Sequence, residues 1–243
     1  MGQLLLVRHG ETEWTLSRRH TSYTDLPLTA NGEDQARAVA AVLAQHPIAL
    51  ALSSPFQRAM RTAELAGLRH AQAEPNLREW EYGDYEGLTT PAIRSTRPGW
   101  VLWTDGVGAS PEDRPGESPQ QVGARADRVL TRIRPLLGDS PLGDVVLVAH
   151  GHFLRVLAAR QLGLPPAAGA LFRLDTGTVS TLGNEHGRPV ITTWNATPPS
   201  PSLRVGQGPR HAATRDAHQA SGADVGGPPA VLVAGVRGED GSD

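Results

Sequence analysis

Short runs of aliphatic residues without polar alternation occur at three places in the chain. They span residues 3–8, Ile48–Leu52 and Val145–Ala149. An uninterrupted apolar run of this length is typical of a strand covered on both faces, as in the parallel sheets of α/β proteins. We therefore expect these three segments to form strands of a buried, mostly parallel sheet.

Helical patterns lie between these runs. The Ala-rich stretch 31–45 has apolar residues at helical spacing, namely Ala36, Val39, Ala40 and Leu43. The pairs Ser54-Pro55 and Ser118-Pro119 each resemble a helix N-cap followed by a proline in the first turn. They predict helices that end near Ala66 and Leu137. Alternating strands and helices predict an α/β fold, a three-layer α/β/α sandwich with helices on both faces of the sheet.

Two segments depart from this alternation. Residues 76–117 contain several Gly and Pro residues and three tryptophans, so we expect a small insertion over the sheet edge. From Thr197 onward the chain is rich in Pro, Gly, Ala and Ser, a composition that favours disorder. The apolar run Ala230–Val236 is expected to be a local patch in that tail. We predict one folded domain over residues 1–196 and a tail over 197–243.

Composition narrows the classes of function. The formal net charge of −2 gives no long-range attraction to nucleic acid or to a membrane surface. No apolar run approaches the ~20 residues that span a bilayer, and no secretory start is present, so we expect a cytoplasmic protein. The chain has no cysteine, which excludes disulfides, thiolate nucleophiles and Cys-based metal sites. All 23 basic residues counted as Lys+Arg are arginine, so arginine must bind any phosphate.

Two of the three predicted strands end in a histidine followed by glycine. Arg8-His9-Gly10 follows the first run, and His150-Gly151 follows the last. The carboxyl ends of strands border the ligand crevice in open α/β sheets. The helix after the middle strand carries Arg58 near its start, so it is expected at the same crevice. Two guanidinium groups beside two imidazoles predict an anion site, since the planar arginine fork matches phosphate oxygens.

Each histidine also has a structural alternative. A lone His at a strand end is more often a satisfied structural residue than a nucleophile. The joint pattern favours function, because both histidines follow aliphatic strands and both precede a glycine, which permits close backbone approach to a ligand. His152 could form a metal pair with His150, but no nearby carboxylate or cysteine completes a ligand set. We expect neither a metal nor another cofactor.

Four ordered motifs resemble those of the histidine phosphatase superfamily, which includes phosphoglycerate mutases and many small-molecule phosphatases. They are LVRHGETEW, SSPFQRAMRTAE, LREWEYGDYEG and VAHGHFLRVL. The resemblance covers roughly residues 3–195. It implies a phosphoglycerate mutase-like fold, with 1–196 as the catalytic domain and the insertion over the active site.

The resemblance also implies roles for single residues. His9 corresponds to the phosphoryl acceptor, and Arg8, Arg58 and His150 to phosphate-binding residues. Glu79 corresponds to the proton donor of the leaving group. A neutral imidazole needs no deprotonation to act as a nucleophile near pH 7, which agrees with the role implied for His9.

Four further residues are implied in substrate binding. The Gly151 amide would contact the phosphate, and Thr15, Thr21 and Ser22 would contact the rest of the substrate. Mutases of this family commonly have Asn at the position of Thr15, and Gly after the threonine where this chain has Thr21-Ser22. We therefore expect contacts at these positions that differ from those of the mutases.

The predicted activity is hydrolysis of small phosphorylated metabolites, such as sugar phosphates, through a phosphohistidine. Family mutases hold a second phosphate with paired basic residues in the insertion, whereas TRPGWVLWTDGVGASPEDRPGES has only scattered arginines. The motifs are most similar to those of bacterial acid phosphatases and sugar-bisphosphate phosphatases. Mutase-type phosphoryl transfer remains an alternative. An inactive binding module would lack at least one of the five implied catalytic residues. The sequence is also compatible with a homodimer.

Overall fold

The computed structural model of the protein describes residues 2–108, 115–138 and 142–199. One six-stranded sheet has the order β3-β2-β4-β1-β5-β6. Its strands are β1 (Leu4–Arg8), β2 (Ile48–Ser53), β3 (Gln72–Ala73), β4 (Asp144–Ala149), β5 (Val179–Glu185) and β6 (Arg188–Ala196). The first four run parallel, whereas β5 pairs antiparallel with both β1 and β6. The three predicted strands are confirmed as the parallel centre of this sheet.

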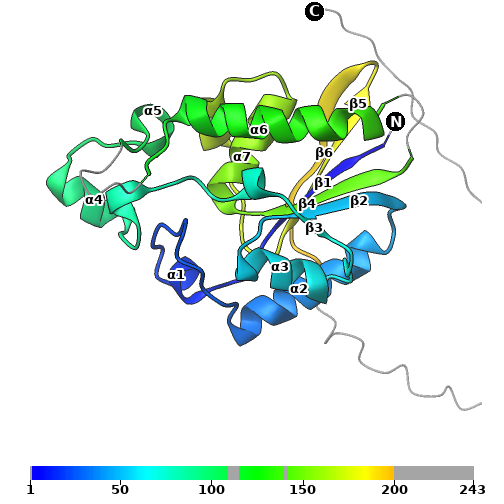
Figure 1. Ribbon diagram of the computed structural model, residues 1–243, viewed down its shortest axis with the longest axis horizontal. Coiled ribbons are helices and arrows are strands. Elements are labelled where there is room, and N and C mark those ends of the chain that lie inside the picture. The colour runs from blue at the N-terminus through cyan, green and yellow to red at the C-terminus, as the bar shows by residue number, and fades with distance from the viewer. Residues whose placement is uncertain (1, 109–114, 139–141, 200–243) are drawn as a thin grey trace, which may run out of the picture. The chain divides into compact units, whose positions relative to one another are not determined.

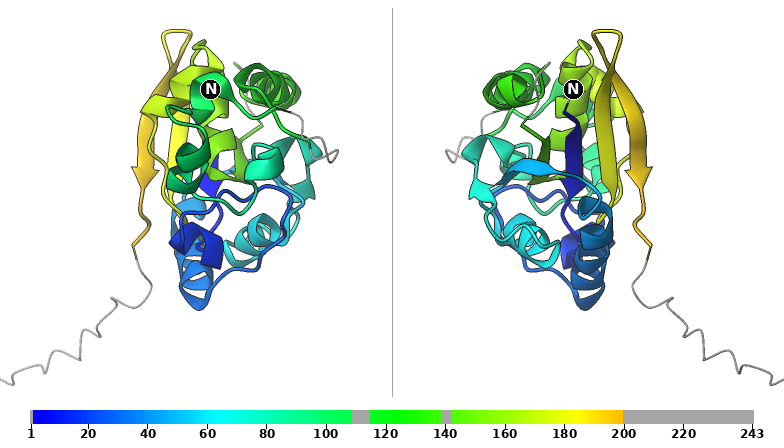
Figure 2. Two further views of the ribbon diagram at one scale, coloured as in Figure 1. Left: turned by 90° about the vertical axis from the view of Figure 1, so that its left-hand side faces the viewer. Right: turned by 90° about the vertical axis from the view of Figure 1, so that its right-hand side faces the viewer.

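Seven α-helices lie in the described ranges, and four of them cover the two faces of the sheet. They are α1 (Glu13–Leu16), α2 (Ala30–Leu43), α3 (Gln57–Leu65), α4 (Thr90–Thr96), α5 (Leu102–Asp105), α6 (Pro119–Ile133) and α7 (Gly151–Gln161). Helices α6 and α7 lie on one face, and α2 and α3 lie on the other (Figure 1, Figure 2). The predicted three-layer α/β/α sandwich is therefore confirmed. None of the described helices is long and apolar enough to cross a membrane.

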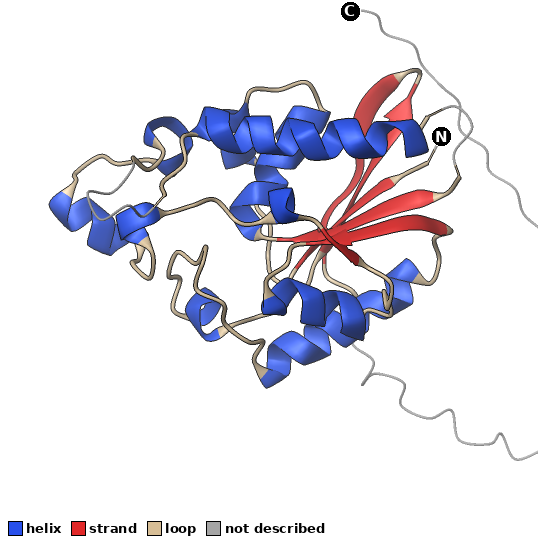
Figure 3. Cartoon of the chain, in the orientation of Figure 1, coloured by secondary structure: helices blue, strands red, loops and turns tan. Residues whose placement is uncertain are grey.

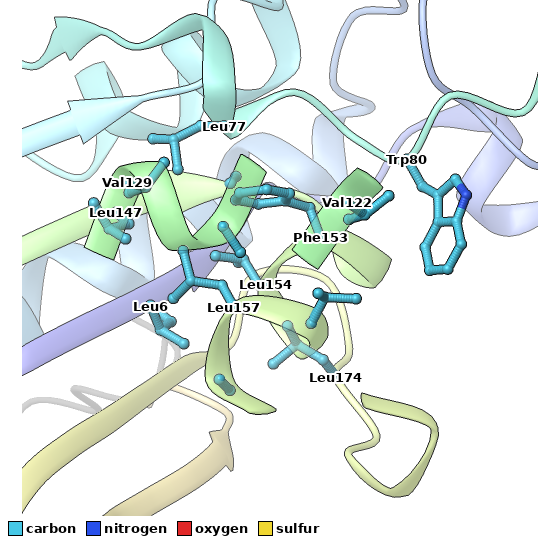
Figure 4. Close-up of a cluster of buried hydrophobic side chains, with 14 of the residues drawn as sticks. Leu6, Leu77, Trp80, Val122, Val129, Leu147, Phe153, Leu154, Leu157 and Leu174 are labelled. Atoms are coloured by element: carbon cyan, nitrogen blue, oxygen red, sulfur yellow. The ribbon is translucent and has the colours of Figure 1, made fainter. Parts of the chain in front are cut away.

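Alternate residues of the central strands fill the two halves of the core. Leu6 and Leu147 point toward α6 and α7 and pack in the larger cluster with Leu154 (Figure 4). Their neighbours Leu5 and Val146 belong to the second cluster, together with apolar residues of α2 and α3. Because successive strand residues face opposite sides of a sheet, continuous aliphatic runs are what two helical layers require.

One of the two predicted serine caps is correct. Ser118 accepts a hydrogen bond from the amide of Gln121 and forms a reciprocal capping box at the start of α6. The prediction for Ser54 is wrong, since α3 begins at Gln57 after Phe56, without a side-chain cap. The Ser54 hydroxyl instead contacts Nε2 of His150 at 2.7 Å. The Ser54 side chain therefore contacts a histidine of the crevice and does not cap α3.

The β5–β6 hairpin was not expected from the sequence. It lies at one edge of the sheet and places Thr and Asn among its apolar residues, so it lacks the continuous runs of the central strands. It extends the parallel core with two antiparallel strands. Most of the predicted tail, including Ala230–Val236, lies outside the described residues.

The insertion is part of the core and also borders the crevice. Figure 3 shows its helices and loops beyond one end of the sheet. Trp80 and Trp100 are buried in the larger core cluster, and the Nε1 groups of both donate to backbone carbonyls. Its residues 109–114 lie outside the described ranges. The tryptophans thus fix the insertion against the domain.

A buried arginine of α6 anchors the start of the insertion. Arg125 donates to both carboxylate oxygens of Glu117, at 2.9 and 2.7 Å. It also donates to the carbonyls of Asn76, Arg78 and Glu79. One guanidinium therefore holds the backbone that carries Glu79.

We expect Arg125→Met to lower the free energy of unfolding by about 3–5 kcal/mol, because it leaves the largely buried Glu117 carboxylate without its charged partner. Chemical denaturation of the purified variant measures this loss. Arg37→Met is the matched control, since Arg37 forms exposed ion pairs with Glu33 and Asp34 that are worth at most about 1 kcal/mol. Similar losses in the two variants would contradict the anchoring role of Arg125.

Candidate active site

The parallel register of β1 and β4 brings the two predicted histidines together. Arg8 pairs with Ala149 in the ladder, so His9 and His150 leave the sheet side by side. Their ring centroids lie 5.1 Å apart at an interplanar angle of 64°. Strand pairing thus turns two distant sequence motifs into one site.

The hydrogen bond of His9 fixes which nitrogen is free to react. Its Nδ1 lies 2.7 Å from the carbonyl oxygen of Gly10, and a carbonyl can only accept, so Nδ1 carries the proton. Nε2 then presents a lone pair. Burial, followed by the charges of Arg58 and Arg8, lowers the pKa of His9 well below its ordinary value. The imidazole is therefore neutral and suited to nucleophilic attack.

The two glycines after the histidines lie against protein atoms. A Cβ on Gly10 would come within 2.2 Å of the Gly32 carbonyl at the start of α2. A Cβ on Gly151 would lie 3.1 Å from Cζ of Arg8. Because Gly10 has no side chain, the loop after His9 packs directly against the start of α2. Because Gly151 has none, the Arg8 guanidinium can approach the N-terminus of α7.

Arg8 has unused hydrogen-bonding capacity at this point. Its Nη1 donates to the carbonyl of Leu174 at 2.6 Å. Its Nε is buried and has no hydrogen-bond partner among the described residues. A buried donor without a partner is costly, so Arg8 is poised to bind an anion. The Gly151 amide at the start of α7 adds to this potential, since helix N-termini favour anions.

Arg58 and His150 are buried next to this anion site. Arg58 is 1% exposed, and its Nε donates to Nδ1 of His150 at 3.2 Å, while Nη1 and Nη2 donate to the carbonyls of Thr24 and Ser22 at 3.0 Å. Because Nδ1 of His150 accepts, its Nε2 carries the proton and donates to Ser54. Burial, then the charge of Arg58, lowers the pKa of His150 well below its ordinary value. A neutral imidazole and a guanidinium thus lie beneath the anion site.

Glu79 lies at the N-terminus of α7. One carboxylate oxygen accepts from the amides of Trp80 and Phe153, both at 2.8 Å. The other accepts from the amide of His152 at 3.0 Å. The insertion and α7 together therefore hold this carboxyl group at the same helix end as Arg8.

A cavity of about 580 Å³ opens over these groups. It is lined by Arg8, His9, Thr15, Arg18, Arg19, His20, Thr21, Glu79, Tyr82, Thr90, Gly151, His152, Arg155, Arg173, Leu174 and Asp175. Six of the predicted site residues therefore share this cavity. Arg58, His150 and Ser22 are not part of its lining.

The three predicted substrate contacts differ in their access to the cavity. Thr15 and Thr21 line it, although the Thr15 hydroxyl donates to the Thr12 carbonyl and the Thr21 hydroxyl to the Arg19 carbonyl. Ser22 is buried, and its hydroxyl donates to Glu86 at 2.7 Å. The carbonyl of Ser22 accepts from Arg58, so the structure gives Ser22 a supporting position and no contact with the cavity.

Several cavity residues were missed by the sequence analysis. Tyr82 and His152 form a short hydrogen bond of 2.6 Å between the phenol oxygen and Nδ1. His20 packs against Tyr82 with ring centroids 4.7 Å apart, and burial lowers the pKa of His20 to about 4. The motifs HGH and EYG contain two of these residues, but no spacing rule joins them to His20. In the described ranges no group of three His, Asp or Glu side chains is arranged to hold a metal.

Comparisons with known proteins agree with this geometry. An acid phosphatase of Mycobacterium tuberculosis is 41% identical over 187 residues, covering 76% of this chain and 88% of the relative. Sedoheptulose 1,7-bisphosphatase of Saccharomyces cerevisiae is 36% identical over 189 residues, covering 66% of this chain and 67% of the relative. These two relatives are named phosphatases.

Solved structures share the fold over the same part of the chain. A protein from Mycobacterium tuberculosis superposes with a TM-score of 0.74 at 38% identity, covering 81% of this chain and 98% of that one. A mycobacterial glucosyl-3-phosphoglycerate phosphatase in complex with VO3 gives a TM-score of 0.69 at 31% identity, covering 81% and 100% of the two chains. The sequence profile of the histidine phosphatase superfamily, branch 1, matches residues 4–197. With the paired histidines and the arginines around them, this match shows that the chain belongs to the histidine phosphatase superfamily.

Proposed function

We propose that the protein is a phosphomonoester hydrolase that acts through a phosphohistidine on small phosphorylated metabolites, such as sugar phosphates, in the cytoplasm. The observation that carries the proposal is the state of His9. Its Nδ1 proton is committed to the Gly10 carbonyl, and His9 lines a cavity together with Arg8, whose Nε has no hydrogen-bond partner within the described ranges. A neutral nucleophile beside an anion site is what attack on a phosphate ester requires.

In the first step, Nε2 of His9 attacks phosphorus and the bond from phosphorus to the ester oxygen breaks. Arg8 and the Gly151 amide neutralise the phosphoryl oxygens from the cavity, and Arg58 and His150 support them from the buried side. Positioning and charge neutralisation are the main sources of catalysis in phosphoryl transfer. The leaving oxygen takes a proton from Glu79, and the alcohol departs.

In the second step, water attacks the phosphohistidine and the bond between phosphorus and nitrogen breaks. Glu79, now a carboxylate, accepts the proton that the water loses. Inorganic phosphate leaves, and His9 returns to its neutral form. No oxidant, reductant or second substrate enters this balance.

The named relatives support a sugar-phosphate substrate class. One acts, by its name, on sedoheptulose 1,7-bisphosphate and another on glucosyl-3-phosphoglycerate. A probable phosphoglycerate mutase of Photorhabdus laumondii is 34% identical over 201 residues, so mutase-type transfer is the second candidate. Mutase-type transfer needs a phosphoenzyme that persists while the product reorients in the cavity. Hydrolysis instead needs water in the cavity. Incubation with 3-phosphoglycerate separates them, since a phosphatase releases phosphate and a mutase releases 2-phosphoglycerate.

We expect phosphate release from p-nitrophenyl phosphate and from sugar phosphates without added metal. Vanadate should inhibit the reaction, because it mimics the five-coordinate phosphorus that forms when Nε2 of His9 attacks. Phosphate assays in the presence of EDTA, followed by vanadate titration, measure both effects. Activity abolished by EDTA and restored by a divalent cation would overturn the proposed mechanism.

A further inference from the structure

Arg155 is a cavity residue that the proposed chemistry does not use. It lies on α7, and its guanidinium stacks over the Trp103 ring at 4.3 Å from the ring centroid. Its Nε donates to the Gly169 carbonyl at 2.9 Å, and its Nη2 donates to the Ala170 carbonyl at 3.1 Å. The guanidinium of Arg155 is thus held in one orientation. Its Nη1 donates to no described residue.

The position of Arg155 relative to the phosphate site follows from the helix. Gly151, where an added Cβ would lie 3.1 Å from Cζ of Arg8, precedes Arg155 by four residues. Residues four apart lie on one helix face, about 6 Å apart along the axis. Arg155 therefore lies one helical turn beyond the expected phosphate, within reach of the remainder of a small substrate.

The positive charge around the cavity exceeds what is needed to neutralise one phosphate group. Five arginines line it, namely Arg8, Arg18, Arg19, Arg155 and Arg173, against the two carboxylates Glu79 and Asp175. Arg173 forms an ion pair with Asp175, and Glu79 accepts three backbone amides. Arg155 has no ion pair with a carboxylate in the described part of the chain. Arg155 lines the cavity, and burial lowers its pKa to about 10 against the opposing effect of the Glu79 charge. The guanidinium is therefore still charged near neutral pH.

We propose that Arg155 binds a second anionic group of the substrate, a carboxylate or a second phosphate, and so selects phosphate esters that carry one. The proposal rests on the proposed phosphatase function and names the substrate class of the same cavity. An arginine held by backbone carbonyls and an aromatic face has little rotamer freedom left to lose, so it binds an oxyanion at low entropic cost.

The test compares substrates with and without the second anion in the full chain. For each variant we measure kcat/KM for 3-phosphoglycerate relative to glycerol 3-phosphate, and for fructose 1,6-bisphosphate relative to fructose 6-phosphate. The first pair probes a carboxylate and the second pair a phosphate. Each ratio is independent of the fraction of folded enzyme, so a partial loss of fold after Arg155→Gln does not obscure the result.

Arg155→Gln should lower at least one ratio by about 10- to 100-fold, the range for a lost hydrogen bond to a charged group. The change should lie mainly in KM, because the second anion is held equally in the ground state and the transition state. Arg155→Lys should restore part of the ratio, since it keeps the charge but loses the fork. Arg160→Gln is the control on the same helix, where Arg160 pairs with Asp127, and it should leave both ratios unchanged.

Both ratios unchanged in Arg155→Gln would overturn the second anion site and leave the phosphatase function standing. A wild-type protein that releases no phosphate from any of these esters or from p-nitrophenyl phosphate would instead overturn the proposed function itself.

Discussion

His9→Ala should abolish both phosphate release and the covalent phosphoenzyme. The rate should fall by more than about 10³-fold, the scale of loss when a nucleophile is removed. The neighbouring His150 cannot replace it, because both of its ring nitrogens are engaged by Arg58 and Ser54. Rapid-quench trapping followed by intact-protein mass spectrometry detects the phosphoenzyme, and a phosphate assay gives the rate.

Two matched histidine variants control this experiment. His150→Ala should slow the reaction but still form a phosphoenzyme, since His9 keeps its bond to the Gly10 carbonyl. His46→Ala should keep turnover, because His46 pairs with Asp144 at the opposite end of β4. A phosphoenzyme trapped in His9→Ala at wild-type yield would refute the assignment of the nucleophile.

Glu79→Gln should slow hydrolysis of alkyl phosphates far more than hydrolysis of p-nitrophenyl phosphate. An alkoxide is a poor leaving group and needs a proton in the transition state, a contribution of roughly 10²–10⁴-fold. A nitrophenolate leaves without that help. Glutamine keeps the size, and its carbonyl oxygen can still accept from the amides of Trp80 and Phe153, whereas its NH2 group cannot accept from His152. The cost of that lost contact should fall on both substrates, so the difference between them reports the transferable proton. Rates on glycerol 3-phosphate and p-nitrophenyl phosphate, measured side by side, give the difference.

The pH dependence tests the neutral state of the nucleophile. Burial, followed by the charges of Arg58 and Arg8, holds the pKa of His9 well below its ordinary value, so Nε2 stays unprotonated as the pH falls through the ordinary range of histidine. The profile of rate against pH should therefore show no loss from protonation of His9 in that range. Equal slowing of both substrate classes in Glu79→Gln would make Glu79 a binding or structural residue, with Glu81 as the next candidate for the acid.

The central fold was predictable because its signals are local. Aliphatic runs such as Leu4–Val7 are buried on both faces, so continuous hydrophobicity carried the strand assignment without further context. The β5–β6 hairpin lies at a sheet edge and carried no such run. Ser54 shows a different limit, since the same Ser-Pro signal indicates a helix cap or a polar strand end, and only the position of His150 decides between them.

The candidate site was predictable where a residue adjoins a strand end or a family motif. His9, Arg8, Glu79 and Gly151 meet at one cavity, and their catalytic roles stay predictions. Ser22 was expected at the substrate but lies behind Arg58. Arg155 was missed because it resembles an ordinary helix arginine until tertiary packing places Trp103 beneath it. Such contacts join residues far apart in sequence and leave no local pattern.

The three amides that hold the Glu79 carboxyl group have a spectroscopic consequence. The amide protons of Trp80, His152 and Phe153 point at its oxygens, so their chemical shifts depend on the charge there. In a nitrogen-15 resolved spectrum, these three resonances should move together when a phosphate analogue binds beside the carboxyl group. These backbone amides therefore report on the Glu79 carboxyl group without a label on the side chain.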